Sequence, residues 1–512
     1  MCAAAAFDHE EATIAGLQAA MASGVLTSRG LSEAYLARIE GVDRSLGSVL
    51  ETNPDALEIA DALDAERRAN GPRGPVHGIP VLVKDNVDTA DRMKTTAGSF
   101  ALGDVAPVRD AFVVRRLREA GAVVLGKANL SEWANFRSTR SSSGWSARGG
   151  QCRNPYALDR SPCGSSSGSG VAVSANLCTV AVGTETDGSI VCPASVNGIV
   201  GIKPTVGLVS RSGIVPVAHS QDTAGPMART VADAAALLSA LAGIDQDDAA
   251  TADARVEADY AAFVGADGLR GARIGVARHL AGFSDRVDRV FDDALAAMRD
   301  LGAALIDPVE ILHVTELDEP ELEVLLHEFK ADVEAYLATL PAEQPYRTLA
   351  DLIAFNEERA EVEMPHFAQE YFERADEKGP LTEPAYLEAL ATCRRLSRDE
   401  GLDAVFDEHG LDAVVAPSNA PAWLIDYANG DHYVGGNSTP AAVAGYPSVT
   451  VPAGFEFDLP LGISFTGRPW SEGALIHYAG AFEHATRHRR PPDLRSRVTS
   501  GGPAAEEGGA RR

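Results

Sequence analysis

Three consecutive serines among glycines, in "SPCGSSSGSG" from Ser161 to Gly170, constrain this chain more than any other feature. Gly/Ser tracts are typical of flexible linkers between folded units. This tract, however, leads directly into the apolar run "VAVSANLCTVAVGTETDGSI", which a solvated linker would rarely do. We therefore expect the serines to lie inside a folded unit, where glycine permits close approach of the backbone.

The charge balance limits the partners of the chain. Its 45 Lys and Arg residues stand against 73 Asp and Glu residues, for a net charge of -28. Such an acidic surface argues against nucleic acid or an anionic membrane as the main partner. No run reaches the roughly 18 apolar residues that a membrane span needs, and Asp8 to Glu11 come too early for a secretory leader.

Cysteine usage and length indicate an ordinary globular protein. The six cysteines are sparse and lack metal-ligand spacing, which fits a reducing, cytoplasmic setting: Cys2, Cys152, Cys163, Cys178, Cys192 and Cys393. With 512 residues and no internal repeat or long linker, the chain predicts one large domain over residues 1–490. Residues 491–512 have the composition of a disordered tail.

Helix and strand patterns alternate along the chain. "AFVVRRLREAGAVVLGKANL" predicts an amphipathic helix closed by Gly121 and a buried strand over Val123–Leu125. The same order returns around "TVADAAALLSALAG", where Thr230 and Asp233 form a capping pair. Residues from about 285 to 410 are helical and acidic and predict a cap over one face of the sheet. "YPSVTVPAGF" and "LPLGISFTG" predict further strands, so we expect an α/β fold.

Three polar side chains stand where a sheet-forming sequence does not need them: Lys84 in "GIPVLVKDN", Ser165 in "CGSSSGSG" and Ser189 in "GTETDGSI". Lys84 follows the apolar "VLV", so we expect it to leave a strand end and enter a buried space, which lysines rarely do without a reason. Taken singly, Lys84 could pair with Asp85 at the surface, and the two serines could form hydrogen bonds to nearby backbone groups in turns. Their combination favours catalysis.

The serine run also permits a second interpretation. Residues 164–168 match the G-x-S-x-G nucleophile elbow, which would make Ser166 the nucleophile. An elbow needs a buried strand before it, whereas "QCRNPYALDRSPC" is polar and has two prolines. It also needs a histidine, and His477, His484 and His488 fall in an Arg-rich helix that suits a solvated face. The elbow is therefore the weaker hypothesis.

Several blocks of this sequence resemble the amidase signature family. They are "GPVHGIPVLVKDN", "TTAGS", "GAVVLGKANLSEW", "SPCGSSSGSGVAVSANL", "GTETDGSIVCPASVNGIVGIKPTVGLVSRSGIVP", "QDTAGPMARTVADAAAL" and "AVAGYPSVTVPAG". The opening "TIAGLQAAMASGVLTSRGLSEAYLARIE" is also similar, so the resemblance covers nearly the whole chain. It implies a single large domain with a central twisted mixed β-sheet covered by helices.

The resemblance also implies a Ser-Ser-Lys triad that works without metal or cofactor. Ser189 falls on the nucleophile, Lys84 on the base and Ser165 on the serine that relays the proton between them. A lysine can accept a proton only when neutral, so burial must lower its pKa from about 10.4. In the family the relay serine sits at a cis peptide bond, which here implies Gly164–Ser165, with Ser165–Ser166 as the alternative.

The loop before the nucleophile implies an oxyanion hole. By resemblance, its donors are the backbone N–H groups of Thr186, Asp187, Gly188 and Ser189. Cys163 and Asp187 stand where the general family pattern has glycine, and both departures are shared by the peptide amidase branch. A carboxylate beside a forming oxyanion would oppose it, so we expect the Asp187 side chain to point away.

Among branches of the family, the sequence is most similar to bacterial peptide amidases, which remove the amide from peptide C-termini. The matching text includes "NLSEWANFR" and "GWSARGGQ". The residues expected near a peptide or small amide substrate are Trp133, Asn135, Phe136, Trp145 and Ser166, with Arg137 and Arg148 as further polar groups. Taken one at a time, the aromatic residues could equally be core and the arginines surface charges.

Other functions remain open on the sequence alone. The chain could act on other small or fatty acyl amides. It could also be an amidotransferase A-type subunit, although its acidic charge disfavours an RNA-bound role. A non-enzymatic scaffold is the least favoured hypothesis, because all three triad residues are present. The sequence leaves the oligomeric state undetermined.

Overall fold

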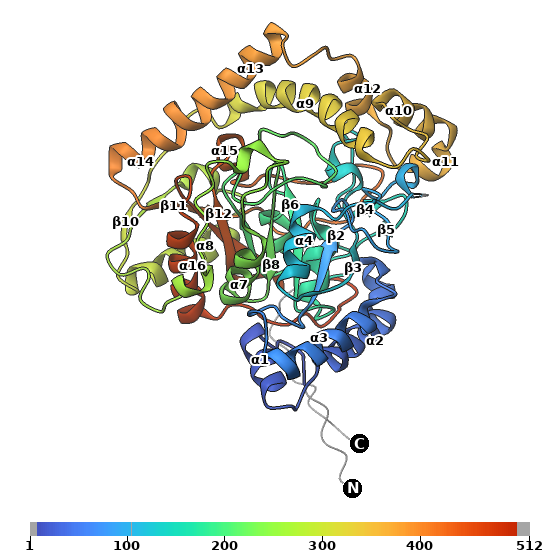
Figure 1. The fold of residues 1–512 in the computed structure, drawn as a ribbon. Coiled ribbons are helices and arrows are strands. Elements are labelled where there is room, and N and C mark those ends of the chain that lie inside the picture. Colours follow the sequence, from blue (N-terminus) through green and yellow to red (C-terminus); the bar gives the residue numbers. More distant parts are fainter. Residues whose placement is uncertain (1–7, 104, 499–512) are drawn as a thin grey trace, which may run out of the picture.

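A mixed sheet of 11 strands runs through the described residues, 8–103 and 105–498 of a computed structural model (Figure 1). Its spatial order is β1 (Val49–Thr52), β3 (Val123–Ala128), β2 (Pro80–Lys84), β6 (Val180–Glu185), β8 (Thr223–Ala228), β7 (Val200–Lys203), β12 (Ser448–Glu456), β13 (Leu459–Thr466), β11 (Ala413–Pro417), β9 (Arg273–Val276) and β10 (Ala304–Ile306). Parallel triplets, β3–β2–β6 and β11–β9–β10, flank an antiparallel middle. The predicted α/β fold with a central mixed sheet is confirmed.

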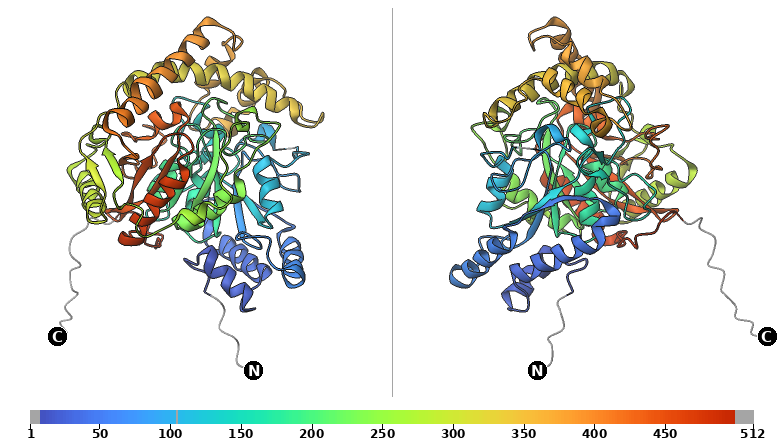
Figure 2. Two further views of the ribbon diagram at one scale, coloured as in Figure 1. Left: turned by 60° about the vertical axis from the view of Figure 1, so that its left-hand side comes forward. Right: turned by 90° about the vertical axis from the view of Figure 1, so that its right-hand side faces the viewer.

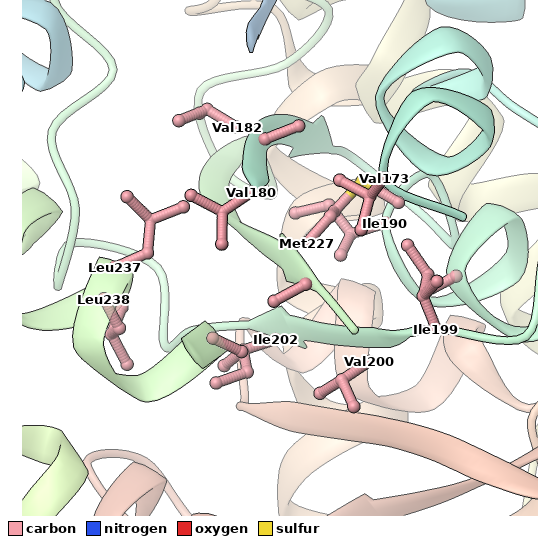
Figure 3. Close-up of a cluster of buried hydrophobic side chains, with 14 of the residues drawn as sticks. Val173, Val180, Val182, Ile190, Ile199, Val200, Ile202, Met227, Leu237 and Leu238 are labelled. Carbon is pink, nitrogen blue, oxygen red and sulfur yellow. The ribbon is translucent and has the colours of Figure 1, made fainter. Parts of the chain in front are cut away.

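Two layers of helices cover this sheet. One layer comprises α4 (Phe112–Glu119), α7 (Val231–Leu241), α16 (Glu472–Thr486) and α8 (Asp285–Asp300), which contact one another in that order. The other comprises α5 (Ser167–Ser174) and α6 (Val191–Val196). Figure 3 shows the resulting core, where strand side chains such as Val180 and Ile202 meet apolar residues of the helices. Because the sheet is buried on both faces, its parallel strands read as continuous apolar runs.

The local elements predicted from pattern are present. α4 ends before Gly121, whose φ of +79° lies in the left-handed region that favours glycine. The Thr230 side chain caps α7 by accepting from the Asp233 N–H at 3.1 Å. The Asp233 carboxylate accepts from the Ile14 N–H at 2.9 Å. The first turn of α7 therefore also fixes the start of α1.

A helical cap arches over one end of the sheet (Figures 1 and 2). It comprises α9 (Asp318–Thr339), α10 (Leu349–Glu358), α11 (Ala360–Glu363), α12 (Glu370–Asp376), α13 (Pro384–Arg394), the π-helical turn Arg395–Leu402 and α14 (Asp403–His409). Tyr336 on α9 donates to Asp88 at 2.8 Å, just beyond the end of β2. The cap therefore covers the edge at which β2 ends rather than a sheet face.

The stretch expected as a cap from residue 285 divides differently in the structure. α8 packs against β12, β13 and α16, and β10 pairs with β9 at the sheet edge. Both belong to the body because α8 is amphipathic and buries Val287, Phe291 and Leu295. The cap helices begin only at residue 318.

The remaining elements lie around the body. The N-terminal helices α1 (Ile14–Ala22), α2 (Ser28–Leu46) and α3 (Ala56–Asn70) lie at the end of the molecule away from the cap (Figures 1 and 2). A small hairpin, β4 (Trp145–Ser146) with β5 (Gly150–Gln151), and helix α15 (Ser438–Ala444) complete the regular elements, apart from short 3₁₀ turns at 100–102, 132–135, 249–251, 260–263, 278–280 and 315–317. No helix of the described residues is long and apolar enough to cross a membrane.

The chain end differs in part from the expected tail. Residues 491–498 lie against the body, where the Leu158 N–H donates to the Arg495 carbonyl at 2.8 Å and Leu494 packs on the core. Residues 499–512 fall outside the described residues.

Candidate active site

Lys84 ends β2 and is fully buried between β3 and β6. Its Nζ donates to Ser165 Oγ at 2.7 Å, to Thr184 Oγ1 at 2.8 Å and to the Thr184 carbonyl at 3.2 Å. Each of these partners is electrically neutral. Burial, which disfavours the ammonium, lowers the pKa of Lys84 to about 7, against the pull of the Asp222 and Glu185 charges. A substantial fraction of Lys84 is therefore neutral near pH 7 and can accept a proton.

Residues 161–166 of the Gly/Ser stretch form a tight loop in the interior, as predicted, while Ser167–Gly170 begin helix α5. Its Gly164–Ser165 peptide is cis, which confirms the expected position of the cis bond. A Cβ on Gly164 would lie 2.0 Å from Ser131 Oγ, and one on Gly168 would lie 2.2 Å from the Ser48 carbonyl. Both positions therefore require glycine for packing. The Ser131 N–H donates to the Ser165 carbonyl at 3.1 Å and fixes the relay serine from the other side.

Ser189 lies in a loop that a buried carboxylate organises. Glu185 Oε1 accepts from the Gly188 N–H at 3.0 Å, and Oε2 accepts from the N–H groups of Ile190 and Val191 at 2.6 and 3.0 Å. The Ser166 N–H donates to the Ser189 carbonyl at 3.1 Å. This bond places residues 161–166, the loop of the expected relay serine (the relay loop), beside residues 186–190, the loop of the expected nucleophile (the nucleophile loop). The Ser189 hydroxyl has no hydrogen-bond partner among the described residues, and the residue is 7% exposed. Its oxygen is thus free for a substrate.

The expected oxyanion donors need one correction. The Gly188 N–H already donates to Glu185, so it cannot also serve an oxyanion. The N–H groups of Thr186, Asp187 and Ser189 have no acceptor among the residues that the structure describes. Asp187 Oδ2 accepts from Thr439 Oγ1 at 2.7 Å, so the carboxyl is directed toward α15. Burial raises the pKa of Asp187.

The elbow hypothesis is wrong. No strand precedes Ser166, which instead lies at the start of α5. Its Oγ donates to the Thr184 carbonyl at 2.9 Å and accepts from the Thr184 N–H at 3.1 Å. The Ser166 hydroxyl is thus hydrogen-bonded to the backbone of β6 in both directions. It is therefore neither the nucleophile nor an available substrate-binding group. His477 lies on α16 and contacts the Phe263 carbonyl at 2.7 Å.

The aromatic residues expected near the substrate pack against the cap. Trp133 meets Phe372 edge to face at 5.5 Å between ring centroids. Phe136 stacks on Tyr371 at 5.0 Å. Trp145 meets Phe367 at 5.1 Å and His366 at 5.4 Å. These rings pack between the body and the cap. Their packing agrees with the alternative that they are core residues, which the sequence left open.

Asn135 keeps an unused polar atom, and its backbone is unusual. Its Nδ2 donates to Ser143 Oγ at 3.2 Å, but its buried Oδ1 has no partner among the described residues, and the same holds for Trp133 Nε1. Trp133, Ala134 and Asn135 have φ values of +48°, +56° and +67°. Successive non-glycine residues in the left-handed region are rare and mark strained, often functional segments.

The two arginines expected near the substrate have other partners. Arg137 is fully buried, forms an ion pair with Glu132 at 2.7 Å and donates to the carbonyls of three cap residues, Glu363, Phe367 and Ala368. Arg148 forms ion pairs with Glu51 at 2.6 Å and Asp85 at 3.5 Å. Arg137 therefore holds the cap against the body. The sequence pattern did not indicate this role, because every partner carbonyl is over 200 residues away.

A cavity of about 780 Å³ lies beside the site and includes none of the triad. Its walls come from residues 88–90, 107–115, 211–222, 247–248 and α9. One wall residue, Asp222, accepts from Thr186 Oγ1 at 2.6 Å, and burial raises its pKa to about 6. Among the described residues, His219, Glu328 and Asp332 hold potential metal-ligating atoms within 4.8 Å of one another. Each has protein partners, since His219 Nδ1 lies 2.9 Å from Asp332 Oδ2 and Glu328 accepts from Tyr386.

The cysteines are not all reduced, although their sparseness fitted a reducing setting. Cys163 and Cys192 form a disulfide across 29 residues, while Cys152, Cys178 and Cys393 are free and buried. The pairing depends on the fold bringing the relay loop to α6. Sequence spacing alone did not indicate it.

Comparison with known proteins agrees with this geometry. A model of the amidase family matches residues 31–476. A probable amidase from Arabidopsis thaliana is 44% identical over 497 residues, which cover 95% of this chain and 92% of that protein. The X-ray structure of native peptide amidase from Stenotrophomonas maltophilia is 52% identical, with a TM-score of 0.90 over 95% of this chain and 99% of that chain. Peptide amidase in complex with the competitive inhibitor chymostatin is 53% identical, with a TM-score of 0.92 over 95% of this chain and 100% of that chain.

The family match spans most of the chain and includes every residue of the expected triad. The sheet order, the buried lysine and the serine loops lie within the same span. This chain therefore belongs to the amidase signature family and is a hydrolase similar to peptide amidase.

Proposed function

We propose that this amidase releases ammonia from the C-terminal carboxamide of peptides, with Ser189, Ser165 and Lys84 as its catalytic residues. The observation that carries the proposal is the 2.7 Å contact between Lys84 Nζ and Ser165 Oγ in a fully buried site. A neutral amine hydrogen-bonded to a hydroxyl is the arrangement that a proton relay requires.

In the first half-reaction, Ser189 Oγ attacks the carbonyl carbon of the amide. As the C–O bond forms, the Ser189 proton passes to Ser165 Oγ, and the Ser165 proton passes to Lys84 Nζ. The N–H groups of Thr186, Asp187 and Ser189 are the available donors for the negative charge that develops on the carbonyl oxygen. The proton then returns through Ser165 to the amide nitrogen, the C–N bond breaks and ammonia leaves.

In the second half-reaction, water attacks the acyl ester on Ser189. The water proton travels by the same relay to Lys84, and its return to Ser189 Oγ releases the free acid. Lys84 must accept a proton in both halves, so its low pKa serves the whole cycle. Burial supplies that low pKa because the ammonium has only neutral hydrogen-bond partners.

Two features support a peptide as the acyl group. The segment that holds Asn135 begins at Ser131, which is hydrogen-bonded to the relay serine, and Asn135 Oδ1 is an unused acceptor for a peptide N–H. Peptide amidase, which is similar over nearly the whole chain, accepts the inhibitor chymostatin.

The buried position of the nucleophile supports a small leaving group. Ser189 is 7% exposed and Ser165 is fully covered. Ammonia can leave from such a site, whereas the C-terminal half of a cleaved peptide would need open space beyond the scissile bond. We therefore expect internal peptide bonds to be spared.

Mass spectrometry of three substrates tests this function. An amidated peptide, its free-acid twin and a long-chain fatty amide are incubated separately with the enzyme. We expect the amidated peptide to be converted to the twin's mass, with ammonia released and internal bonds intact. Faster turnover of the fatty amide, or internal cleavage, would refute the peptide specificity, and Ser189→Ala serves as the inactive control.

A further inference from the structure

The relay loop, residues 161–166, and the nucleophile loop, residues 186–190, contain no strand or α-helix. Within the described residues, a single backbone hydrogen bond joins them, from the Ser166 N–H to the Ser189 carbonyl. The Cys163–Cys192 disulfide adds a covalent link from the relay loop to α6, which directly follows the nucleophile loop. We propose that this disulfide is a positioning element of the active site, which holds Ser165 in reach of Ser189 so that turnover depends on the bridge. The inference rests on the proposed triad.

The bridge joins the relay loop to the first turn of α6, close to both reacting hydroxyls. Cys163 is separated from Ser165 only by Gly164. Cys192 lies in the first turn of α6, three residues after Ser189, and its N–H donates to the Gly188 carbonyl at 2.8 Å. A shift of either cysteine is therefore transmitted to a catalytic loop within three residues.

The backbone at Cys163 gives an independent indication. Its φ is +57°, in the left-handed region that favours glycine over a residue with a side chain. A cysteine in this conformation carries a steric penalty that glycine would avoid. Cys163 and Cys192 are both buried and are joined by the disulfide. Glycine at position 163 would relieve the steric penalty but could not form this bridge.

Proton relay makes strict demands on this geometry. Ser165 Oγ must stay within hydrogen-bond distance of Lys84 Nζ, as it does at 2.7 Å, and must also reach Ser189 Oγ. Lys84 is fixed by β2, and Ser189 is fixed by Glu185. A displacement of about 1 Å at a reacting group is enough to cost about 100-fold in rate. The bridge restrains such a displacement of the relay loop relative to the nucleophile.

The first experiment replaces the bridge with residues that suit the backbone. Cys163→Gly/Cys192→Ala lacks the disulfide, and glycine adopts the required φ freely, so the variant should fold. We expect kcat for an amidated peptide to fall roughly 10-fold or more, with KM changed less than about threefold, because the loss concerns transition-state geometry. The pH dependence should keep its position, since the burial that lowers the pKa of Lys84 is untouched.

The matched control is Cys178→Ala, which removes a buried free thiol and leaves the bridge in place. It should retain the wild-type kcat. Thermal midpoints are measured for every variant, so that loss of folded protein is separated from loss of rate. A folded bridge variant with an unchanged kcat would overturn the proposal.

Reduction of the wild type is the second test, and it does not depend on how a variant folds. Dithiothreitol donates two electrons and two protons, the S–S bond breaks into two thiols, and the reagent closes to its cyclic disulfide. Reduction, confirmed by thiol counting, should lower kcat as in the double variant, and reoxidation should restore it. If the reduced enzyme keeps full activity, the bridge does not position the site.

Labelling by a fluorophosphonate separates this inference from the proposed function. The reagent reacts with an activated serine whatever the natural substrate is. Slower labelling in the bridge variant supports the positioning role even if peptide amides prove to be poor substrates. Unchanged labelling together with a lower kcat would contradict it, and labelling that survives in Ser189→Ala would refute the triad itself.

Discussion

Lys84 and Lys127 occupy neighbouring parallel strands and share the same degree of burial. Lys84 ends β2 and Lys127 is the penultimate residue of β3, and both are fully buried. Burial lowers the pKa of each. In the register of the two strands, Val83 pairs with Lys127 and Lys84 with Ala128, so the two lysines point to opposite faces of the sheet.

The difference lies in what each ammonium meets. Lys84 Nζ meets hydroxyls and a carbonyl, all of them neutral. Lys127 Nζ donates to the Val87 carbonyl and to Thr95 Oγ1, and the charges of Asp85 and Asp88 lie nearby and favour its protonated form. Burial alone therefore does not define a base. In the proposed triad, Ser165 connects Lys84 to the loop of Ser189, whereas the partners of Lys127, Val87 and Thr95, lie outside both serine loops.

The largest expected effect is the loss of turnover in Lys84→Met. Methionine matches the lysine stem but cannot accept the Ser165 proton, so kcat for peptide amides should fall by about 10³-fold or more. Ser165→Ala and Ser189→Ala should have losses that do not add to it, because the three residues act as one unit. Steady-state kinetics on single and double variants measures this. Retention of most activity in Lys84→Met would remove the contrast between the lysines.

Lys127→Met should destabilise the protein rather than the reaction. The substitution removes the donor to the buried Val87 carbonyl and Thr95 Oγ1, and leaving buried polar groups unpaired costs about 1–3 kcal/mol. Chemical denaturation should show a loss of that order, whereas kcat per folded molecule should stay within about 10-fold of wild type. A variant as stable as wild type but inactive would place Lys127 in the reaction.

The sequence distinguished these lysines only by resemblance. "VLVK" and "VLGK" are nearly the same local pattern, and both predict a strand end. Family blocks pointed to Lys84, Ser165 and Ser189, and the structure brings the first two into contact and sets Ser189 beside the relay loop. The strands and capped helices were predictable because their signals are local and periodic.

The missed features depend on how the chain folds, either within one loop or between segments distant in sequence. Glu185 ends a strand, where many polar residues occur, and only the folded loop shows that it accepts from three N–H groups. The Cys163–Cys192 pairing and the Arg137 contacts with the cap likewise arise from tertiary packing. Trp133 and Phe136 were expected near the substrate, whereas they pack against the cap. The sequence around an aromatic residue does not show whether its ring will contact a substrate or another part of the protein.

The stability of the enzyme should depend on pH through Lys84. Its pKa is about 7 in the folded protein and ordinarily 10.5, so between these values the unfolded chain holds more protons. Stability therefore rises with pH across this window, by up to about 1.4 kcal/mol per unit. The difference in unfolding free energy between wild type and Lys84→Met should change by about 2 kcal/mol from pH 7.5 to 9. Lys127 is present in both proteins, so its own titration cancels, and a constant difference would contradict the low pKa.

The smallest effect is expected from Thr184→Val, which alters only the neutral surroundings of Lys84. In the wild type, kcat should rise with pH through a limb near 7, because protonated Lys84 cannot accept the relayed proton. Thr184 Oγ1 accepts from Lys84 at 2.8 Å and so stabilises the ammonium. Valine removes this acceptor, which should lower the pKa of Lys84 further and move the limb to lower pH by less than about one unit. Thr184→Ser keeps the hydroxyl and should restore the wild-type limb. A shift toward higher pH would mean that the hydroxyl favours the neutral amine rather than the ammonium.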